Sequence, residues 1–154
     1  MVKVLFVCHG NICRSPMAEF VMKDIVKKNG LEDCFEIASC ATSREEIGNS
    51  VHYGTRKKLR EHNISCEGKR ARQLVREDIN KYDYLLCADS RNVINTMRRV
   101  NSNDSTRILR LLDYTDHPRD IADPWYTDNF DITYDDVVEG CTAFLDYVKK
   151  EHNL

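Results

Sequence analysis

The stretch VKVLFVCHGNICRSPMAEF (2–20) sets the fold of this chain. Its first seven residues, Val2–Cys8, are mostly apolar and β-branched, which predicts a strand buried on both faces. A short loop follows, and then Ser15 and Pro16, a pair typical of a helix start with Ser15 at the N-cap and Pro16 as the first helical residue. Apolar residues at helical spacing come next. The stretch therefore predicts a strand, a tight loop and a helix.

The alternation of strand-like and helix-like segments continues to the end of the chain. We expect further strands over 35–40, 82–87 and 108–112, and further helices over 52–61, 90–99 and 134–150. A long polar stretch, 113–131, precedes the last helix, and loops of this length are usually functional or disordered. This alternation predicts an α/β fold, with helices on both faces of a parallel sheet and a ligand site at the carboxyl ends of the strands.

The composition fits a single domain, 1–154, that folds without disulfides. The net charge of −2 argues against a nucleic-acid-binding protein, and no apolar run approaches the ~18 residues of a membrane span. Seven cysteines, an odd number, favour free thiols in a reducing compartment. Because the first residues also lack the features of a secretory signal, we expect a cytoplasmic protein. Nothing in the sequence demands an oligomer, so we expect a monomer.

The loop after the first strand carries the residues of an oxyanion site. Cys8 and Arg14 stand six positions apart, and Gly10 and Asn11 between them tolerate the positive φ that turns backbone N–H groups inward. The helix N-terminus adds donors, and the Arg14 guanidinium can bind an oxyanion through two hydrogen bonds. Such surroundings favour a nucleophilic thiolate at Cys8. The alternative for Cys8 is a small buried hydrophobe at the end of a strand.

The spacing alone is weak evidence, because Cys66 and Arg72 repeat it. Cys66 follows no strong strand, and the neighbouring Glu67 disfavours a thiolate. Cys13 shares the loop with Cys8 and is either a packing residue or a redox partner. The other cysteines lie in apolar periodic surroundings and are expected to pack: Cys34, Cys40, Cys87 and Cys141.

A second group of candidates lies in the long polar stretch. If the oxyanion is a phosphoryl group, its transfer to a thiolate also needs an acid for the leaving oxygen. Asp123 is the best candidate because Pro124 restricts its backbone, and Trp125 and Tyr126 would wall a slot for a flat substrate. The alternative is a purely structural loop that aromatic packing anchors, in which Asp123 is only a turn residue.

These segments together resemble the low-molecular-weight protein tyrosine phosphatases. The run from Val7 to Pro16 is similar to the phosphate-binding loop of that family, and further similar segments follow in family order over nearly the whole chain: Ala41-Thr42-Ser43, Glu46-Ile47-Gly48-Asn49, Ala71-Arg72-Gln73, Tyr82-Asp83-Tyr84 and Asp123-Pro124. The resemblance implies a four-stranded parallel sheet flanked by helices, without metal or cofactor. It implies hydrolysis of phosphotyrosine proteins or peptides and of small aryl phosphates, with inorganic phosphate as product.

The resemblance also implies catalytic roles. Cys8 would be the nucleophile that forms a phosphocysteine, and Ser15 would donate to its sulfur. Asp123 would protonate the leaving oxygen and then activate water. Since Asp123 must be protonated while Cys8 is ionised, we expect a bell-shaped pH profile with an acid-side optimum. Arg14 and the loop residues would bind the phosphoryl oxygens, the loop residues being His9, Gly10, Asn11, Ile12 and Cys13.

Support and redox roles follow from the same resemblance. Asn11 would hold the strained loop, with Ser39 and His52 as supports. Cys13 matches a second loop cysteine, which in this family can form a reversible disulfide with Cys8 under oxidants.

Further positions bear on substrate choice. Ile12 stands where a threonine is associated with phosphoarginine preference in related bacterial enzymes, so Ile12 favours phosphotyrosine. Glu45 stands where some relatives carry an aromatic wall residue, and His9 at a position that is often aliphatic. Trp125 and Tyr126 keep the aromatic slot, and Tyr126 is a candidate site for regulatory modification.

Two other functions remain open. An arsenate reductase of the same fold would look similar at the loop, but it needs two further cysteines within a short segment, and Cys87 lies 21 positions after Cys66. A non-catalytic phosphotyrosine-binding or redox-sensing module would be expected to lose Cys8, Arg14 or Asp123, and all three are present.

Overall fold

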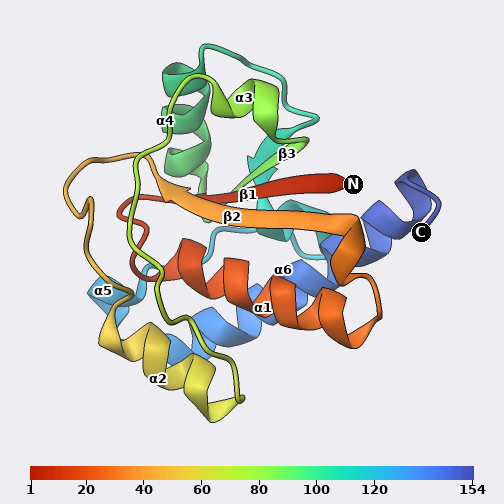
Figure 1. Cartoon of the computed structure of the whole chain (residues 1–154). Helices are drawn as coiled ribbons and strands as arrows, with labels where there is room; N and C mark the ends of the chain where they lie inside the picture. The colour runs from red at the N-terminus through yellow and green to blue at the C-terminus, as the bar shows by residue number, and fades with distance from the viewer.

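The computed structural model describes all residues, 1–154, and confirms the predicted α/β architecture (Figure 1). Four strands form one parallel sheet in the order β2-β1-β3-β4. The strands are β1 Val2–Cys8, β2 Phe35–Ala41, β3 Tyr84–Cys87 and β4 Ile108–Arg110. The helices are α1 Arg14–Lys28, α2 Tyr53–Glu61, α3 Asp78–Lys81, α4 Ser90–Val100, α5 Pro124–Thr127 and α6 Phe130–Glu151, with 3-10 segments at Glu32–Cys34 and Leu111–Tyr114.

Alternation along β1 explains why helices cover both faces of the sheet. Val4 and Phe6 point to one face and pack with α1 and α6, whereas Leu5 and Val7 point to the other face and pack with α4. None of these four side chains is more than 1% exposed. Figure 1 shows the result, with α1, α2 and α6 on one side of the sheet and α3 and α4 on the other.

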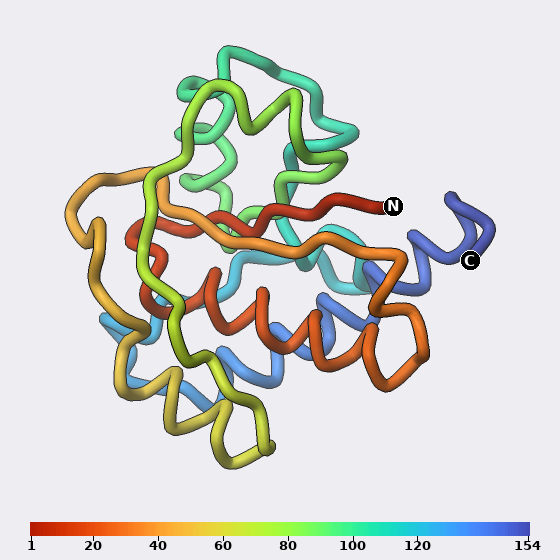
Figure 2. Tube along the Cα trace, in the orientation of Figure 1, coloured from red at the N-terminus to blue at the C-terminus, as the bar shows by residue number.

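The parallel arrangement gathers the functional loops at one edge. The carboxyl end of β1 leads into the loop before α1, and α5 and the start of α2 lie beside that loop (Figure 1). Both chain termini lie toward the opposite end of the sheet (Figure 2). The expected ligand site therefore has the carboxyl ends of the strands as its base.

Two predicted boundaries near the loop and the sheet edge are wrong. Ser15 is not the N-cap of α1, because its hydroxyl turns to the Cys8 sulfur and Cys13 takes the cap position. The strand predicted over 108–112 ends at Arg110, since Asp113 accepts a hydrogen bond from the backbone N–H of Arg110 (2.9 Å) and the chain turns into a 3-10 segment.

The polar stretch 113–131 is more regular than predicted. It contains α5, and α6 begins at Phe130, four residues before the predicted position 134. The side chain of Asn129 accepts a hydrogen bond from the N–H of Ile132 (3.1 Å) and so caps α6 earlier. The sequence did not predict α3, which has only four residues, and β3 begins at Tyr84 instead of at position 82.

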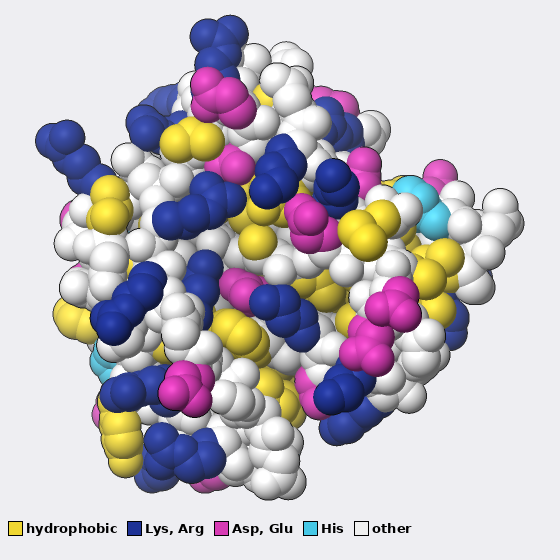
Figure 3. Space-filling view, viewed as in Figure 1, with side chains coloured by type: hydrophobic (Ala, Val, Ile, Leu, Met, Phe, Trp, Pro, Cys, Tyr) yellow, Lys and Arg dark blue, Asp and Glu magenta, His cyan; other side chains and the backbone are white.

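The surface carries charges of both signs. On the face shown in Figure 3, lysines and arginines alternate with aspartates and glutamates and leave no broad field of one sign, which agrees with the net charge of −2. None of the helices combines the length and apolar character needed to cross a membrane.

Candidate active site

The loop between β1 and α1 wraps around the sulfur of Cys8. Of the two permissive loop residues, only Asn11 adopts a positive φ, 59°, a conformation that Asn tolerates better than most residues. The backbone N–H of Asn11 donates to Cys8 Sγ at 3.3 Å, and Ser15 Oγ lies 3.0 Å from the same sulfur. The side chain predicted to be the nucleophile is therefore contacted by two polar groups of its own loop.

Asn11 connects this loop to β2. Its Nδ2 donates to Ser15 Oγ (2.8 Å) and to Ser39 Oγ (2.9 Å), and its Oδ1 accepts from the backbone N–H of Arg72 (3.2 Å). Asn11 and Ser39 are at most 1% exposed, so these bonds replace hydrogen bonds to water. The other predicted support, His52, reaches the loop through its backbone, whose N–H donates to the carbonyl of Ile12 (2.8 Å).

Glu19 of α1 extends this network, and the sequence analysis missed it. Ser39 Oγ and Lys23 Nζ both donate to its carboxylate at 2.6 Å, and Lys69 Nζ lies 3.4 Å away. Burial lowers the pKa of Lys69, although Glu19 opposes that shift. The sequence did carry a signal for Glu19, namely a charged residue at an inward position of the α1 pattern. A buried carboxylate needs polar or cationic partners, so such a residue indicates a buried polar network.

The Arg14 guanidinium is buried at the floor of the site. Its NH1 donates to Asp89 Oδ2 (2.7 Å) and to the carbonyl of Ile121 (2.8 Å), and its NH2 lies 3.5 Å from Asp123 Oδ2. Burial alone would lower the pKa of Arg14, but the negative charges of Cys8, Asp89 and Asp123 outweigh it and raise the pKa. Arg14 is thus a fixed cation whose remaining N–H donors can bind an oxyanion.

Asp89 is a second residue that the sequence analysis missed. It is the N-cap of α4, where its Oδ1 accepts from the N–H of Asn92 (2.8 Å) while its Oδ2 holds Arg14. The signal was an acidic residue at the carboxyl end of the third strand, directly before the helix start at Ser90. Only the parallel sheet brings that position next to the first loop.

Asp123 approaches the same guanidinium from the polar stretch. It is the N-cap of α5, and its Oδ1 accepts from the N–H of Trp125 (3.0 Å), while its other oxygen faces Arg14. Trp125 and Tyr126 are 59% and 84% exposed. The Trp125 ring meets the His52 ring edge-on, with 5.7 Å between centroids, but both Trp125 and Tyr126 remain mostly exposed, which favours the wall of a slot.

These groups surround one cavity of about 390 Å³ at the carboxyl ends of the strands. Its lining consists of Cys8, His9, Gly10, Ile12, Cys13, Arg14, Glu45, Glu46, Asp123, Trp125 and Tyr126. Among the predicted site residues, Asn11, Ser15 and Ser39 do not line it and instead hold the loop from behind. Glu46 was not predicted as a site residue.

The rim of the cavity carries an exposed hydrogen bond between two side chains. His9 Nε2 and Glu45 Oε2 lie 2.9 Å apart, and both side chains are more than half exposed. This contact joins the loop between β1 and α1 to the loop after β2. His9, at a position that is often aliphatic in the family, therefore has a polar partner in the structure.

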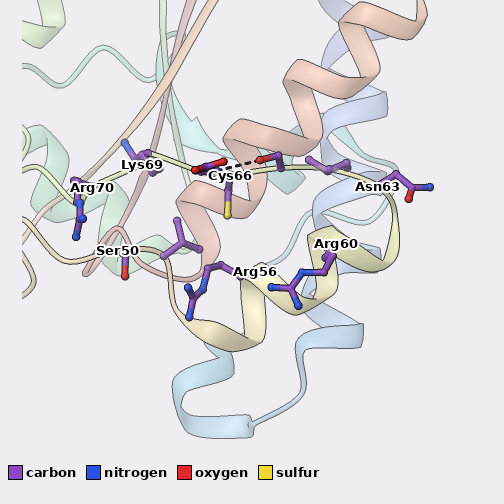
Figure 4. Close-up of a pocket in the computed structure, with 12 residues that line it drawn as sticks. Ser50, Arg56, Arg60, Asn63, Cys66, Lys69 and Arg70 are labelled. Carbon is purple, nitrogen blue, oxygen red and sulfur yellow. Dashed lines mark hydrogen bonds between the residues drawn. The ribbon is translucent and has the colours of Figure 1, made fainter.

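Cys13 and Cys66 lie in surroundings that differ from those of Cys8. Both loop cysteines are free, and burial, together with Cys8, raises the pKa of the Cys13 thiol to about 12. Cys66 lies in a separate cavity of about 530 Å³ that also contains Arg56 (Figure 4). Burial raises the pKa of Cys66, and Arg72 pairs instead with Asp78 (3.1 Å). The second Cys–Arg match is therefore not an oxyanion loop.

Comparison with known proteins identifies the family. A sequence model described as "Low molecular weight phosphotyrosine protein phosphatase" matches residues 3–154. This chain belongs to that family. It is 38% identical over 156 residues to the low molecular weight protein-tyrosine-phosphatase YfkJ of Bacillus subtilis, with all of both chains covered. It is 37% identical to PtpA of Staphylococcus aureus, covering 100% of this chain and 98% of the relative.

Solved structures agree with the family assignment. The crystal structure of YfkJ superimposes with a TM-score of 0.94 over 98% of this chain and 96% of that one. A Drosophila arginine phosphatase has the same fold, with a TM-score of 0.86, 27% identity and coverage of 96% and 98%. The chain is thus a phosphatase of the phosphoric monoester hydrolase class, whose fold also occurs in a protein named for another phosphorylated residue.

Proposed function

We propose that this phosphatase hydrolyses phosphotyrosine in two steps, through a phosphocysteine on Cys8 and with Asp123 as the general acid. The observation that carries the proposal is that Cys8, Arg14 and Asp123 line one cavity, although Asp123 is more than 100 positions from the loop. A nucleophile, an oxyanion clamp and a proton donor in one cavity are the parts that phosphoryl transfer requires.

In the first step the thiolate of Cys8 attacks phosphorus. The S–P bond forms as the P–O bond to the phenol breaks, and Asp123 gives its proton to the leaving oxygen. Charge on the equatorial oxygens is met by Arg14 and by the N–H groups of the loop, which are held in place before the reaction begins. The Asp89 and Ile121 contacts of Arg14 supply that fixed position.

In the second step water attacks the phosphocysteine. The Asp123 carboxylate takes a proton from the water, the S–P bond breaks, and inorganic phosphate leaves. Ser15 Oγ, 3.0 Å from the sulfur, donates to the departing thiolate. Both steps use only groups of this chain, with no cofactor.

The cavity walls support an aryl substrate. Trp125 and Tyr126 present exposed rings at the mouth, and Ile12 adds an apolar side chain on the loop. A phenyl ring gains from such surfaces, whereas a charged guanidine leaving group would require polar partners. We therefore place phosphotyrosine above phosphoarginine as the substrate.

The proposal also covers the compartment, the oligomeric state and the regulation of the enzyme. The enzyme acts as a cytoplasmic monomer on tyrosine-phosphorylated proteins, consistent with seven free cysteines. Under oxidants, Cys8 and Cys13 form a reversible disulfide that stops turnover, because the nucleophile is consumed. The arsenate reductase alternative is weakened by Cys87, which is fully buried and lies against Thr96 (3.5 Å).

The test is hydrolysis of phosphotyrosine and para-nitrophenyl phosphate from pH 4 to 9, under reducing conditions. Cys8→Ser should lower kcat by roughly four orders of magnitude or more, since it removes the nucleophile. Asp123→Ala should lower kcat by about 10²- to 10⁴-fold and make the rate depend more steeply on the acidity of the leaving phenol. Asp128→Asn, which removes the charge of an acidic residue outside the cavity and tolerates its positive φ, is the control and should keep activity.

Several outcomes would contradict the proposal. These are an inert reduced wild type that still binds phosphate, a Cys8→Ser variant with wild-type turnover, or steady arsenate reduction with thioredoxin. A pH optimum above neutrality would contradict the assigned protonation states of Cys8 and Asp123.

A further inference from the structure

A second cavity opens beside the catalytic one. It measures about 320 Å³, and its lining is entirely non-apolar: His9, Thr42, Ser43, Asn95, Arg98 and Arg99. His9 lines both cavities, so they are neighbours across a single side chain. The N–H of Thr42 donates to the carbonyl of Cys8 (2.9 Å) and that of Ser43 to the carbonyl of His9 (3.1 Å), so one wall is fixed to the catalytic loop.

The second cavity carries positive charge without a balancing carboxylate. Arg98 and Arg99, at the end of α4, belong to its lining, and no aspartate or glutamate does. Arg99 donates its Nε to the carbonyl of Leu74 (2.6 Å), which fixes the side chain and leaves its terminal N–H groups free, and Arg98 is exposed. The cavity is therefore suited to an anionic group.

The two neighbouring cavities differ in the charge of their linings. Glu45 and Glu46 line the catalytic cavity, and Glu45 pairs with His9, whereas the two arginines line the cavity that shares His9. An extended peptide advances ~3.3 Å per residue, so the residues next to a bound phosphotyrosine lie at the mouth of the catalytic cavity. A peptide residue that lies over the second cavity would meet Arg98 and Arg99.

We propose that the second cavity is a subsite for an acidic residue next to the phosphotyrosine of a protein substrate. The inference rests on the proposed phosphotyrosine hydrolysis. Aspartate or glutamate on the flank over Arg98 and Arg99 strengthens binding, and lysine or arginine on that flank weakens it. Specificity is therefore one-sided, with acidic residues favoured on the flank over the second cavity.

The test uses alanine-based phosphotyrosine peptides with one glutamate or one lysine at either of two positions on each side. On one side only, glutamate should give a kcat/KM about three- to tenfold above lysine at low salt, the range expected for one or two exposed ion pairs. Exposed charges are screened by salt, so the ratio should approach one near ~1 M ionic strength.

Substitutions test whether the preference for glutamate peptides arises from the second cavity. Arg98→Gln should reduce the preference, and Arg98→Glu should reverse it toward lysine peptides. Arg99→Gln should also reduce it, but Arg99 holds a backbone carbonyl, so the Arg98 variants decide the question if Arg99→Gln unfolds. The control is Arg56→Gln with Arg60→Gln, which removes two charges from the unrelated cavity of Figure 4 and should leave the preference unchanged.

Para-nitrophenyl phosphate separates the two proposals, because it has no flanking residues. Wild type and all these variants should hydrolyse it at similar rates. If wild type does not hydrolyse it, the proposed function fails. If it is hydrolysed while glutamate and lysine peptides react equally on both sides, or if the Arg56/Arg60 control changes the preference as much as Arg98→Glu, the subsite is refuted and the phosphatase proposal stands.

Discussion

At the residue scale, Asn11 shapes the loop in three ways, through both its backbone and its side chain. It adopts a φ of 59°, aims its N–H at the Cys8 sulfur, and uses its amide to hold Ser15, Ser39 and the Arg72 backbone. The sequence predicted the loop residues as candidates, but it did not predict this hydrogen-bond network, because Ser39 and Arg72 are 28 and 61 positions away.

Two substitutions at Asn11 separate its backbone role from its side-chain role. Asn11→Gly keeps the positive φ and loses the buried hydrogen bonds, which should lower the free energy of unfolding by about 1–3 kcal/mol. Asn11→Ala should cost about 1 kcal/mol more, because an alanine is strained at this φ. Urea denaturation measures both, and equal stabilities for the two variants would show that the φ imposes no strain.

At the element scale, α6 packs closely against the 3-10 segment after β4. A Cβ added to Gly140 of α6 would lie 2.6 Å from Leu111 Cγ, closer than such atoms approach in proteins. Gly140 therefore lets α6 approach the sheet, although glycine is unfavourable inside a helix.

Gly140→Ala consequently has two opposing effects on stability, one through helix propensity and one through packing. Alanine favours the helix by about 1 kcal/mol, but overpacking against a buried leucine costs about 1–3 kcal/mol, so we expect net destabilisation. Thermal and urea unfolding measure the sign. Leu111→Ala in the same chain should relieve the clash, so the double variant should be more stable than the sum of the single changes predicts. A Gly140→Ala variant more stable than wild type would show that α6 has room to move.

At the scale of the whole molecule, buried thiols couple stability to pH. Burial raises the pKa of Cys13 and of Cys87 to about 12, and raises the pKa of Cys40 and Cys141 as well. In the unfolded chain these thiols ionise near their ordinary value of 9.0. Above that pH the unfolded state binds fewer protons than the folded state, so stability falls as pH rises.

We therefore expect the free energy of unfolding to be unaffected by these thiols below about pH 8 and to decrease between about pH 9 and 12. Each thiol contributes up to about 1.4 kcal/mol per pH unit in that window. Urea denaturation at pH 8, 9.5 and 10.5 gives the slope. Cys141→Ala should lower stability at pH 8, and this deficit should shrink as the pH rises because the slope falls by about one proton. An unchanged slope would contradict the assignment.

The sequence by itself determined the strand-helix alternation and the position of the loop between β1 and α1. Both are local: the run Val2–Cys8 is apolar on both faces, and a loop with Cys8 and Arg14 follows it directly. Boundaries were less accurate where side chains turn to distant partners. Ser15 contacts Cys8 instead of capping α1, and Asn129 starts α6 early.

Only the tertiary structure decided what surrounds that loop. Arg14 meets Asp89 and Asp123 from 75 and 109 positions away, and Glu19 reaches the loop through Ser39. The physical reason is that local patterns fix which elements form, whereas the order and register of the parallel strands fix which loops meet at their carboxyl ends. The sequence therefore determined which residues the loop presents, and the packing of the sheet determined their partners and the shape of the cavity.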